Sequence, residues 1–468
     1  MRKTKIICTL GPASESNEVI RQMIEAGTDV FRLNMSHAKH EWVREIVPRV
    51  RSIAHELEHN VALLLDTQGP AIRTGVLPND LKLAVGDILE ITVRGAAPQE
   101  ANSITVNYDG LIDDVEVGGV VLLDNGLMQV RVLTKKDNRI RASVLTAGTL
   151  GSRRHINLPG VHVNLPALTE KDLADVALGV ELEVDFVALS FGRRKEDLEE
   201  LRQVLKKHGS TAAVVAKIES EGAVRDLDDM IEASDIVLIA RGDLGIECPM
   251  EDLPIIQRRI VKRCLRVGKP VIVATQMLES MISHPVPTRA EITDVANAVF
   301  EQADAIMLTG ETTSGRYPVE CVKVLNRVAT RIERSGGAGY GEDAILEDSR
   351  QKTVAAAVAL ADSLPRAKIL VFTRSGTMAR NVSNLRPERA PIFAFASTER
   401  VCRQLALSWG TFPVQLDFTE EPNATIEAAE KYLRAAKLIV PNDNLIVISD
   451  VRAGDSLVDC VQLRQVCK

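Results

Sequence analysis

The amino-acid sequence predicts an α/β fold: a (β/α)8 barrel with a small all-β domain inserted after its third strand and an open α/β domain towards the C-terminal end. Three observations indicate this fold class. Eight short apolar runs of strand length alternate with amphipathic stretches of helical length. One interval between these runs is several times longer than the others. A glycine-rich stretch separates the eighth run from a second α/β series.

The eight runs are the predicted barrel strands, and they begin near Lys5, Asp29, Val61, Asp185, Ala213, Asp235, Pro270 and Asp304. Strands that alternate with helices form right-handed parallel βαβ units, and eight such units close into a barrel. The active site of such a barrel lies at the carboxyl ends of its strands. Polar residues collect at these ends, which a purely structural core does not predict: Arg32, Asn34, Asp66, Ser190, Lys217, Glu219, Arg241, Asp243, Thr275, Thr309 and Glu311.

The long interval follows the third run and predicts a compact domain inserted into the barrel. This segment is rich in valine, aspartate and glycine, carries turn signals such as Asp109-Gly110, and shows little helical periodicity. The pattern is typical of a small all-β module, which on this face of a barrel can act as a lid that excludes water. We therefore predict a catalytic barrel and a β lid with these boundaries: residues 1–69 and 166–338 for the barrel, and 70–165 for the lid.

The glycine-rich stretch Ser335–Gly341 predicts a linker. Beyond it, helix and strand patterns alternate again, so we predict a separate open α/β domain at residues 345–468. Its first strand leads into a turn that places hydroxyl groups and a glycine at a predicted helix start: Thr373, Arg374, Ser375, Gly376 and Thr377. Such a turn can bind a phosphate group through backbone N–H groups, or it can be an ordinary helix cap.

The composition excludes several kinds of partner. The formal net charge is −7, there is no basic block, and aromatic residues make up only 3%, so we expect no nucleic acid partner. The seven cysteines are scattered and show no Cys-x-x-Cys spacing, which indicates reduced thiols in a cytoplasmic protein. No apolar span of membrane-crossing length occurs, so we also expect no membrane partner.

Two of the strand ends carry opposite charges at a spacing of two residues. In a strand, side chains two apart share a face, so Lys217 and Glu219 should point the same way, as should Arg241 and Asp243. Two carboxylates beside a lysine and an arginine suit a divalent cation that holds an anionic ligand. A structural network of ion pairs is the alternative interpretation.

These strand ends belong to a series of motifs that resembles the pyruvate kinases. The motifs that carry the resemblance are TKIICTLGPAS, FRLNMSH, LLLDTQGPAIRTG, NLPGVHVNLPALTEKD, AKIESEGA, ARGDLGIE, ATQMLESM, PTRAEITDVANAV and LTGETTSGRYP. The resemblance is densest over residues 4–75 and 156–320. It implies transfer of the phosphoryl group from phosphoenolpyruvate to ADP, which gives pyruvate and ATP in the last step of glycolysis. It also implies a divalent metal, and often potassium.

The resemblance assigns roles to individual residues. It implies that Glu219 and Asp243 hold Mg²⁺ or Mn²⁺ and that Lys217 stabilises the transition state. Arg32 and Arg73 match arginines that contact phosphate, and both are implied to be catalytic. Gly242 and Thr275 match residues that contact the substrate, together with Arg32 and Asp243, and Thr275 matches a residue near the proton path to the enolate. The nucleotide contacts implied are Asn34, Met35, Ser36, His37, Arg73 and Arg154.

The implied potassium ligands form an all-oxygen set: Asn34, Ser36, Asp66 and Thr67. After this set the family usually reads Lys-Gly-Pro-Glu, whereas this chain reads Gln68-Gly69-Pro70-Ala71. Members with lysine at the position of Ala71 carry an internal positive charge and can dispense with potassium. Alanine supplies no such charge, so we expect this chain to be activated by K⁺.

The resemblance further implies allosteric control and a homotetramer. In regulated members the C-terminal domain binds a phosphorylated sugar or nucleotide, and here the turn from Thr373 to Thr377 would hold its phosphate. Two other functions remain open at this point. One is a lyase or aldolase that acts on a pyruvate-like enolate, with Lys217 as a Schiff base or Mg²⁺ as the stabilising ion. The other is a non-catalytic metabolite sensor, although the chain retains Lys217, Glu219 and Asp243.

Overall fold

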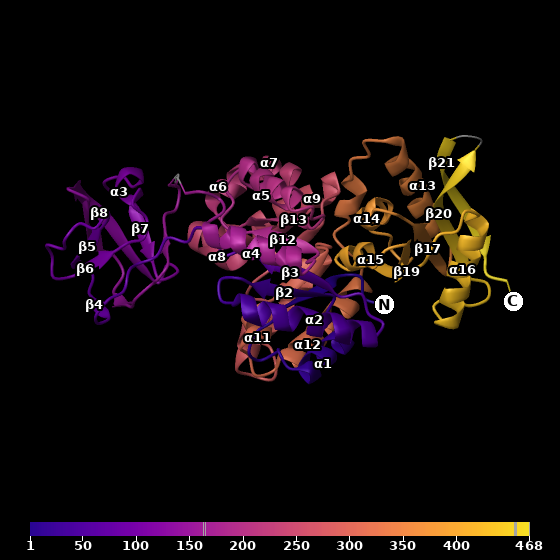
Figure 1. The fold of residues 1–468 in the computed structure, drawn as a ribbon, viewed down its shortest axis with the longest axis horizontal. Helices are drawn as coiled ribbons and strands as arrows, with labels where there is room; N and C mark the ends of the chain where they lie inside the picture. The colour runs from indigo at the N-terminus through magenta and orange to yellow at the C-terminus, as the bar shows by residue number, and fades with distance from the viewer. Residues whose placement is uncertain (162, 164, 454–455, 468) are drawn as a thin grey trace.

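The computed structural model describes residues 1–161, 163, 165–453 and 456–467. Figure 1 shows three parts in a row, with a small β domain at one end, the barrel in the middle and an α/β domain at the other end. The N-terminus lies on the side of the barrel that faces the C-terminal domain.

The central part is a closed barrel of eight parallel strands, which confirms the predicted fold class. Its strands pair in the order β1-β16-β15-β14-β13-β12-β3-β2. Each begins within one residue of its predicted start. The starts were predictable because strands buried on both faces are continuous apolar runs in the sequence. The strands are β1 (Lys5–Thr9), β2 (Val30–Asn34), β3 (Ala62–Asp66), β12 (Phe186–Leu189), β13 (Ala213–Ile218), β14 (Ile236–Ala240), β15 (Val271–Ala274) and β16 (Ala305–Leu308).

Helices surround the barrel and turn their apolar faces towards it. Two of them begin with a reciprocal capping box, Thr169 with Asp172 and Thr288 with Glu291. In the described part of the chain, no helix is both long enough and apolar enough to cross a membrane. The helices are α1 (Asn17–Ala26), α2 (His40–Glu56), α4 (Glu170–Glu181), α5 (Lys195–Lys207), α6 (Glu221–Arg225), α7 (Leu227–Ala233), α8 (Arg241–Glu247), η1 (Met250–Asp252), α9 (Leu253–Val267), η2 (Glu279–Ile282), α10 (Arg289–Phe300), α11 (Gly310–Thr313) and α12 (Pro318–Glu333).

The inserted domain has its own apolar core, and the regular elements of its described residues are strands, apart from the four-residue helix α3 (Leu111–Asp114). Its main sheet has the order β11-β7-β8-β9-β5-β6, and β4 pairs with β10 in a second sheet. The strands are β4 (Leu81–Leu83), β5 (Ile88–Thr92), β6 (Ser103–Thr105), β7 (Val120–Leu123), β8 (Met128–Lys136), β9 (Arg139–Val144), β10 (Gly148–Leu150) and β11 (Ile156–Asn157).

The C-terminal domain is an open five-stranded sheet of order β19-β18-β17-β20-β21 with helices packed against it. Among the described strand pairs of this sheet, only β20 with β21 is antiparallel. Part of the predicted linker forms a short 3-10 helix, η3 (Tyr340–Asp343). The remaining elements are α13 (Ser349–Ser363), β17 (Ala367–Phe372), α14 (Thr377–Asn384), β18 (Ile392–Ala396), α15 (Glu399–Leu405), β19 (Thr411–Gln415), α16 (Pro422–Ala435), β20 (Asn444–Ala453) and β21 (Ser456–Gln465).

The C-terminal domain closes the bottom of the barrel, at the amino ends of the strands. Ala406 and Leu407, which follow α15, belong to the same buried apolar cluster as the inward-facing residues of the barrel strands. Two buried ion pairs also join the C-terminal domain to the barrel: Arg403 with Asp185 at 2.9 Å and Arg386 with Asp304 at 2.7 Å. The opposite end of the barrel is therefore the end left for ligands.

Candidate active site

Lys217 lies at the centre of a polar cluster at the carboxyl ends of three neighbouring strands, β3, β12 and β13. Its Nζ donates a hydrogen bond to Ser190 Oγ at 2.7 Å and lies 3.3 Å from Asp66 Oδ1 and 3.1 Å from Glu219 Oε2. Burial lowers the pKa of Lys217, but the two carboxylates outweigh it, so the pKa is raised. Lys217 is thus a permanently charged ammonium group held in a fixed position.

Asp66 connects Lys217 to Arg32. Arg32 Nε donates to Asp66 Oδ2 at 2.6 Å, and its Nη1 donates to Thr9 Oγ1 at 3.1 Å. Burial alone would raise the pKa of Asp66, yet Lys217 and Arg32 lower it further than burial raises it. Asp66 therefore stays ionised and orients two cations towards the same rim.

Glu219 and Asp243 form the acidic side of the cluster. The backbone N–H of Phe191 donates to Glu219 Oε1. Glu219 Oε2 lies 3.1 Å from Lys217 Nζ, but this buried oxygen has no hydrogen-bond partner among the described residues. Burial raises the pKa of Glu219 to about 7, and the nearby Asp243 acts in the same direction. Burial also raises the pKa of Asp243.

Such a pair of poorly solvated carboxylates, one with an open oxygen, fits a hard divalent cation. Among the described residues, no group of three or more His, Cys, Asp or Glu side chains is arranged to hold a metal. Two carboxylates leave the other coordination positions of a cation to oxygen atoms from water or substrate.

The prediction that Arg241 and Asp243 share a strand face is wrong. Strand β14 ends at Ala240, and both residues lie in helix α8, where side chains two apart do not face each other. Arg241 instead donates to Asp294 Oδ1 at 2.6 Å and to the carbonyl oxygen of Thr275 at 2.7 Å. The prediction for Lys217 and Glu219 is confirmed by their 3.1 Å separation.

Thr275 has a backbone conformation that is rare for a β-branched residue, with φ of 69°. Its Oγ1 accepts a hydrogen bond from the backbone N–H of Gly242 at 2.7 Å and donates one to the carbonyl oxygen of Ala274 at 2.7 Å. Strain of this kind persists only where neighbouring contacts impose it, and here Arg241 holds the carbonyl oxygen. The structure therefore brings Thr275 and Gly242 together at the start of α8.

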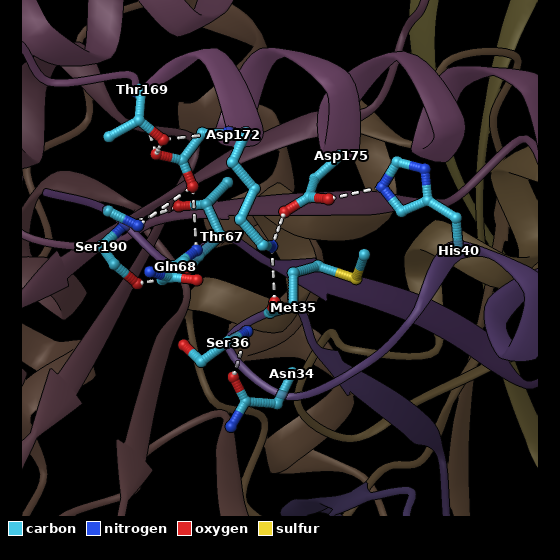
Figure 2. A network of polar contacts seen from close by, with 12 residues as sticks. Asn34, Met35, Ser36, His40, Thr67, Gln68, Thr169, Asp172, Asp175 and Ser190 are labelled. Atoms are coloured by element: carbon cyan, nitrogen blue, oxygen red, sulfur yellow. Dashed lines mark hydrogen bonds and ion pairs between the residues drawn. The ribbon is translucent and has the colours of Figure 1, made fainter. Parts of the chain in front are cut away.

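Helix α4 holds the loops that follow β2 and β3, as Figure 2 shows. Asp172 Oδ1 accepts hydrogen bonds from the backbone N–H groups of Gln68 and Gly69, both at 3.0 Å. Lys171 Nζ donates to the carbonyl oxygen of Met35 at 2.7 Å and pairs with Asp175, which also contacts His40. The network fixes both loops that contain predicted potassium ligands.

Those predicted ligands are the last residues of two adjacent strands, Asn34 and Asp66, and the residues just after them, Ser36 and Thr67. Asn34 is the register partner of Asp66, and its Oδ1 accepts a hydrogen bond from the backbone N–H of Ser36 at 3.2 Å. Thr67 Oγ1 accepts a hydrogen bond from the backbone N–H of Ser190 at 3.1 Å. His37 N–H bonds the carbonyl oxygen of Asn34, which closes the turn. The four oxygen-bearing residues are therefore neighbours beside the Lys217 cluster.

Arg73 and Arg154 lie apart from this cluster, in the inserted domain. Arg73 Nη1 donates to the carbonyl oxygen of Arg153 at 3.1 Å, and Arg154 pairs with Asp124 at 3.5 Å. Within the described ranges, neither guanidinium group makes a hydrogen bond or ion pair with the barrel rim. Burial, together with Arg73, lowers the pKa of the neighbouring His155 to about 4.

The turn from Thr373 to Thr377 lies at the start of α14 in the C-terminal domain. The N-cap of this helix is Gly376, with φ of 82°, and no side chain caps the helix. Thr373 Oγ1 accepts from the N–H of Gly376 at 3.0 Å, and the hydroxyl groups of Ser375 and Thr377 are 3.0 Å apart. The hydroxyl groups of Ser375 and Thr377 are thus not used for capping. Arg374 is exposed in this turn.

The sequence did not assign a role to Ser190, which the structure places at the centre of the rim. Its Oγ contacts Asp66 Oδ1 at 3.1 Å, the carbonyl oxygen of Thr67 at 2.6 Å and Lys217 Nζ at 2.7 Å. In the sequence, the feature that could have indicated this role is a small hydroxyl residue directly after a buried strand. Asp172 was also missed, and its signal was the Thr-x-x-Asp capping pattern that begins at Thr169.

Comparisons with known proteins agree over nearly the whole chain. A family model described as pyruvate kinase, barrel domain, matches residues 1–322, and one described as pyruvate kinase, alpha/beta domain, matches residues 351–461. The chain is 40% identical to a pyruvate kinase from Geobacillus stearothermophilus, with 97% of this chain and 78% of the relative covered. It is 41% identical to plastidial pyruvate kinase 3 from Arabidopsis thaliana, with 94% and 76% covered. A crystal structure of a pyruvate kinase from Cryptosporidium parvum superposes with a TM-score of 0.94 at 32% identity, with 99% and 96% covered.

Proposed function

Because this chain belongs to the pyruvate kinase family, we propose that the Lys217 cluster is where it performs the family's reaction. The chain transfers the phosphoryl group of phosphoenolpyruvate to ADP and gives pyruvate and ATP. Family membership disfavours the lyase or aldolase alternative. The observation that carries the location is the convergence of Lys217, Arg32 and Glu219 at one end of the barrel.

Glu219 and Asp243 would hold Mg²⁺ or Mn²⁺, which when bound supplies positive charge beside the phosphoryl and enolate oxygens. The open Oε2 of Glu219 and the raised pKa of both carboxyl groups support this assignment. Gly242 and Asp243, at the start of α8, would contact the substrate carboxylate, and Gly242 N–H would then exchange its present acceptor, Thr275 Oγ1, for the substrate.

Phosphoryl transfer depends mainly on position and on compensation of charge. Lys217 would balance the charge that develops on the transferred group and on the enolate oxygen, without having to reorganise. Arg32 would bind phosphate oxygens while Asp66 keeps its guanidinium plane fixed. The Thr275 hydroxyl, held against Gly242, would orient the proton delivered to the enolate carbon.

The nucleotide would lie between the barrel rim and the inserted domain. Asn34, at the end of β2, would contact it together with Met35, Ser36 and His37 from the loop that follows, and Arg73 and Arg154 would contact its phosphates from the lid. Because the two arginines are apart from the rim, we propose that the lid closes over the bound substrates. This proposal retains the predicted boundaries: barrel at 1–69 and 166–338, lid at 70–165 and regulatory domain at 345–468.

Production of ATP from phosphoenolpyruvate and ADP tests the function, and we expect it to require a divalent cation. Chelation should abolish ATP formation, and Mg²⁺ or Mn²⁺ should restore it. Glu219→Gln should weaken Mg²⁺ binding roughly tenfold or more, because one ligand charge is lost. The exposed neighbour Glu221 offers a matched control, and Glu221→Gln should bind Mg²⁺ like the wild type. The same Mg²⁺ affinity in both variants would contradict the assignment of Glu219.

The direction of the pH effect follows from the raised pKa of Glu219. An acid with a pKa of about 7 is increasingly protonated below that pH, and the proton competes with the metal. The Mg²⁺ affinity measured by calorimetry should therefore fall on the order of tenfold from pH 8 to pH 6. Binding of Mg²⁺ in this range should also release protons.

Potassium activation is a second expected property. Asn34, Ser36, Asp66 and Thr67 would supply the oxygen ligands, and Ala71 supplies no substitute charge. We expect the rate of ATP formation to fall by roughly a factor of ten or more when tetramethylammonium replaces K⁺, because one compensating charge beside the substrate phosphate is lost. Ala71→Lys should reduce that dependence. A full wild-type rate without K⁺ would overturn this proposal.

Allosteric control by a phosphorylated sugar or a nucleotide, homotetrameric assembly and a cytoplasmic location stay predictions from the sequence and the resemblance.

A further inference from the structure

Arg241 is a charged residue at the barrel rim to which the proposed reaction assigns no role. It begins α8, directly before Gly242 and Asp243. Its guanidinium group does not turn towards Asp243 but crosses from the end of β14 to the carboxyl end of β15, the neighbouring strand. The contacts of this side chain therefore indicate what it does at the rim.

The donors of the Arg241 guanidinium group are all used within the described part of the protein. The group makes five hydrogen bonds, as many as a guanidinium group has N–H donors. Nε donates to the carbonyl oxygen of Ala274 at 3.3 Å, and Nη2 donates to the carbonyl oxygen of Thr275 at 2.7 Å and to Met277 Sδ. The side chain is only 11% exposed. Arg241 thus acts on the loop that follows β15 and not on a ligand.

Two side chains fix the orientation of this guanidinium group. Nη1 donates to Asp294 Oδ1, on α10, at 2.6 Å and to Gln257 Oε1, on α9, at 3.3 Å. The buried Gln257 donates in turn to Glu301 Oε2 at 2.9 Å. Because the guanidinium group is planar, anchoring Nη1 also determines where Nη2 points, which is at the carbonyl oxygen of Thr275. Arg241 is therefore preorganised for its contact with this loop.

The loop after β15 has a backbone conformation that requires such support. Thr275 and Gln276 have φ of 69° and 55°, a region that residues with side chains rarely adopt. In this conformation the Thr275 hydroxyl accepts the backbone N–H of Gly242 at 2.7 Å. Strain of this kind persists only where the surroundings impose it. Without Arg241 the loop would relax, and the Thr275 hydroxyl would leave its position at the rim.

We propose that Arg241 is a positioning residue for the protonation of the enolate, and that it acts by holding Thr275. This role rests on the proposed function. When the substrate carboxylate takes over the Gly242 N–H, the contacts of Arg241 keep the loop in place. The enolate carbon then takes a proton that comes from water beside the Thr275 hydroxyl. The C=C π electrons form the new C–H bond, and the enolate C–O⁻ becomes the C=O of pyruvate.

Exchange of the pyruvate methyl protons in D₂O tests this role, because removal of a methyl proton is the reverse of enolate protonation. The exchange is followed by NMR with the full chain, Mg²⁺, K⁺ and ATP. Arg241→Met should slow it by about tenfold or more, since the proton path is misaligned. ATP formation from phosphoenolpyruvate and ADP should fall less, because phosphoryl transfer precedes protonation.

Two further variants separate positioning from a structural role. Thr275→Ala should slow the exchange as well, and the double variant with Arg241→Met should be no slower than Thr275→Ala, because Arg241 acts through Thr275. Arg263→Met is the matched control. It breaks an arginine–aspartate pair of the same length, 2.6 Å to Asp228, on the outer side of α9, and should exchange protons like the wild type.

Three results would overturn the proposal: unchanged exchange in Arg241→Met, equal losses of exchange and ATP formation in that variant, or a double variant whose loss is the product of the two single losses. If Arg241→Met does not fold, Arg241→Lys decides by the same criteria, because it retains the charge but not the planar fork. Absence of ATP formation by the wild type would instead contradict the proposed function, so the two failures are distinguishable.

Discussion

Replacing Lys217 by methionine should lower turnover by roughly two to three orders of magnitude, the usual effect of removing one preorganised group that stabilises charge in the transition state. The loss should appear in kcat, since the ammonium group compensates charge that develops only during transfer. Lys217 is held by Ser190, Asp66 and Glu219. The other lysine near this rim, Lys171, is already bound to the Met35 carbonyl oxygen and to Asp175. A steady-state assay of ATP formation measures the effect.

Metal binding separates this catalytic role from a structural one. Lys217→Met retains both carboxylates of the predicted metal site, so Mg²⁺ should still bind with an affinity close to that of the wild type. Lys195→Met, on the exposed start of α5, is the matched control and should retain full activity. Activity of Lys217→Met above about a tenth of the wild type would be incompatible with the assigned role, because the ammonium group would then contribute less than about tenfold to the rate.

Replacing Arg386 by methionine should destabilise the protein by about 3–5 kcal/mol, the usual cost of leaving a buried charge unpaired. Arg386 Nη2 donates to Asp304 Oδ2 at 2.7 Å, and both side chains are only 3% exposed. Asp304 also accepts hydrogen bonds from the backbone N–H groups of Val271 and Trp409. The variant would therefore keep the carboxylate buried between the barrel and the C-terminal domain without its cation.

Unfolding in guanidinium chloride measures this effect as a lower midpoint. The exposed Arg389 provides the comparison, and Arg389→Met should shift the midpoint little. A midpoint for Arg386→Met within the scatter of this control would show that the pair contributes nothing net to stability. Asp304→Asn provides a second variant, which removes the charge and retains much of the shape.

The parts of the fold that could be predicted are those set by local patterns. Each barrel strand is a continuous apolar run because it is buried on both faces, so its start was visible in the sequence. Lys217 and Glu219 could be placed together because both are at the end of one run. Arg241 and Asp243 could not, since the strand ends at Ala240, before either residue, and both residues lie in helix α8.

Contacts between distant segments could not be predicted from such patterns. Ser190 became recognisable as the centre of the rim only after closure of the barrel placed β12 between β3 and β13. A cavity between the barrel and the C-terminal domain is lined by residues of both, such as Lys206 and Arg400, which have no shared sequence signal. The separation of Arg73 from the rim depends on the orientation of the inserted domain, which short turns do not determine.

The seating of Ala406 and Leu407 inside the barrel has a consequence for biosynthesis. The ribosome synthesises the eight barrel strands before this pair of residues. Until the pair has been made, the apolar bottom of the nascent barrel is uncovered. During that interval it is a natural client for chaperones that shield hydrophobic surface. Maturation of the catalytic half is thereby tied to completion of the domain that follows it.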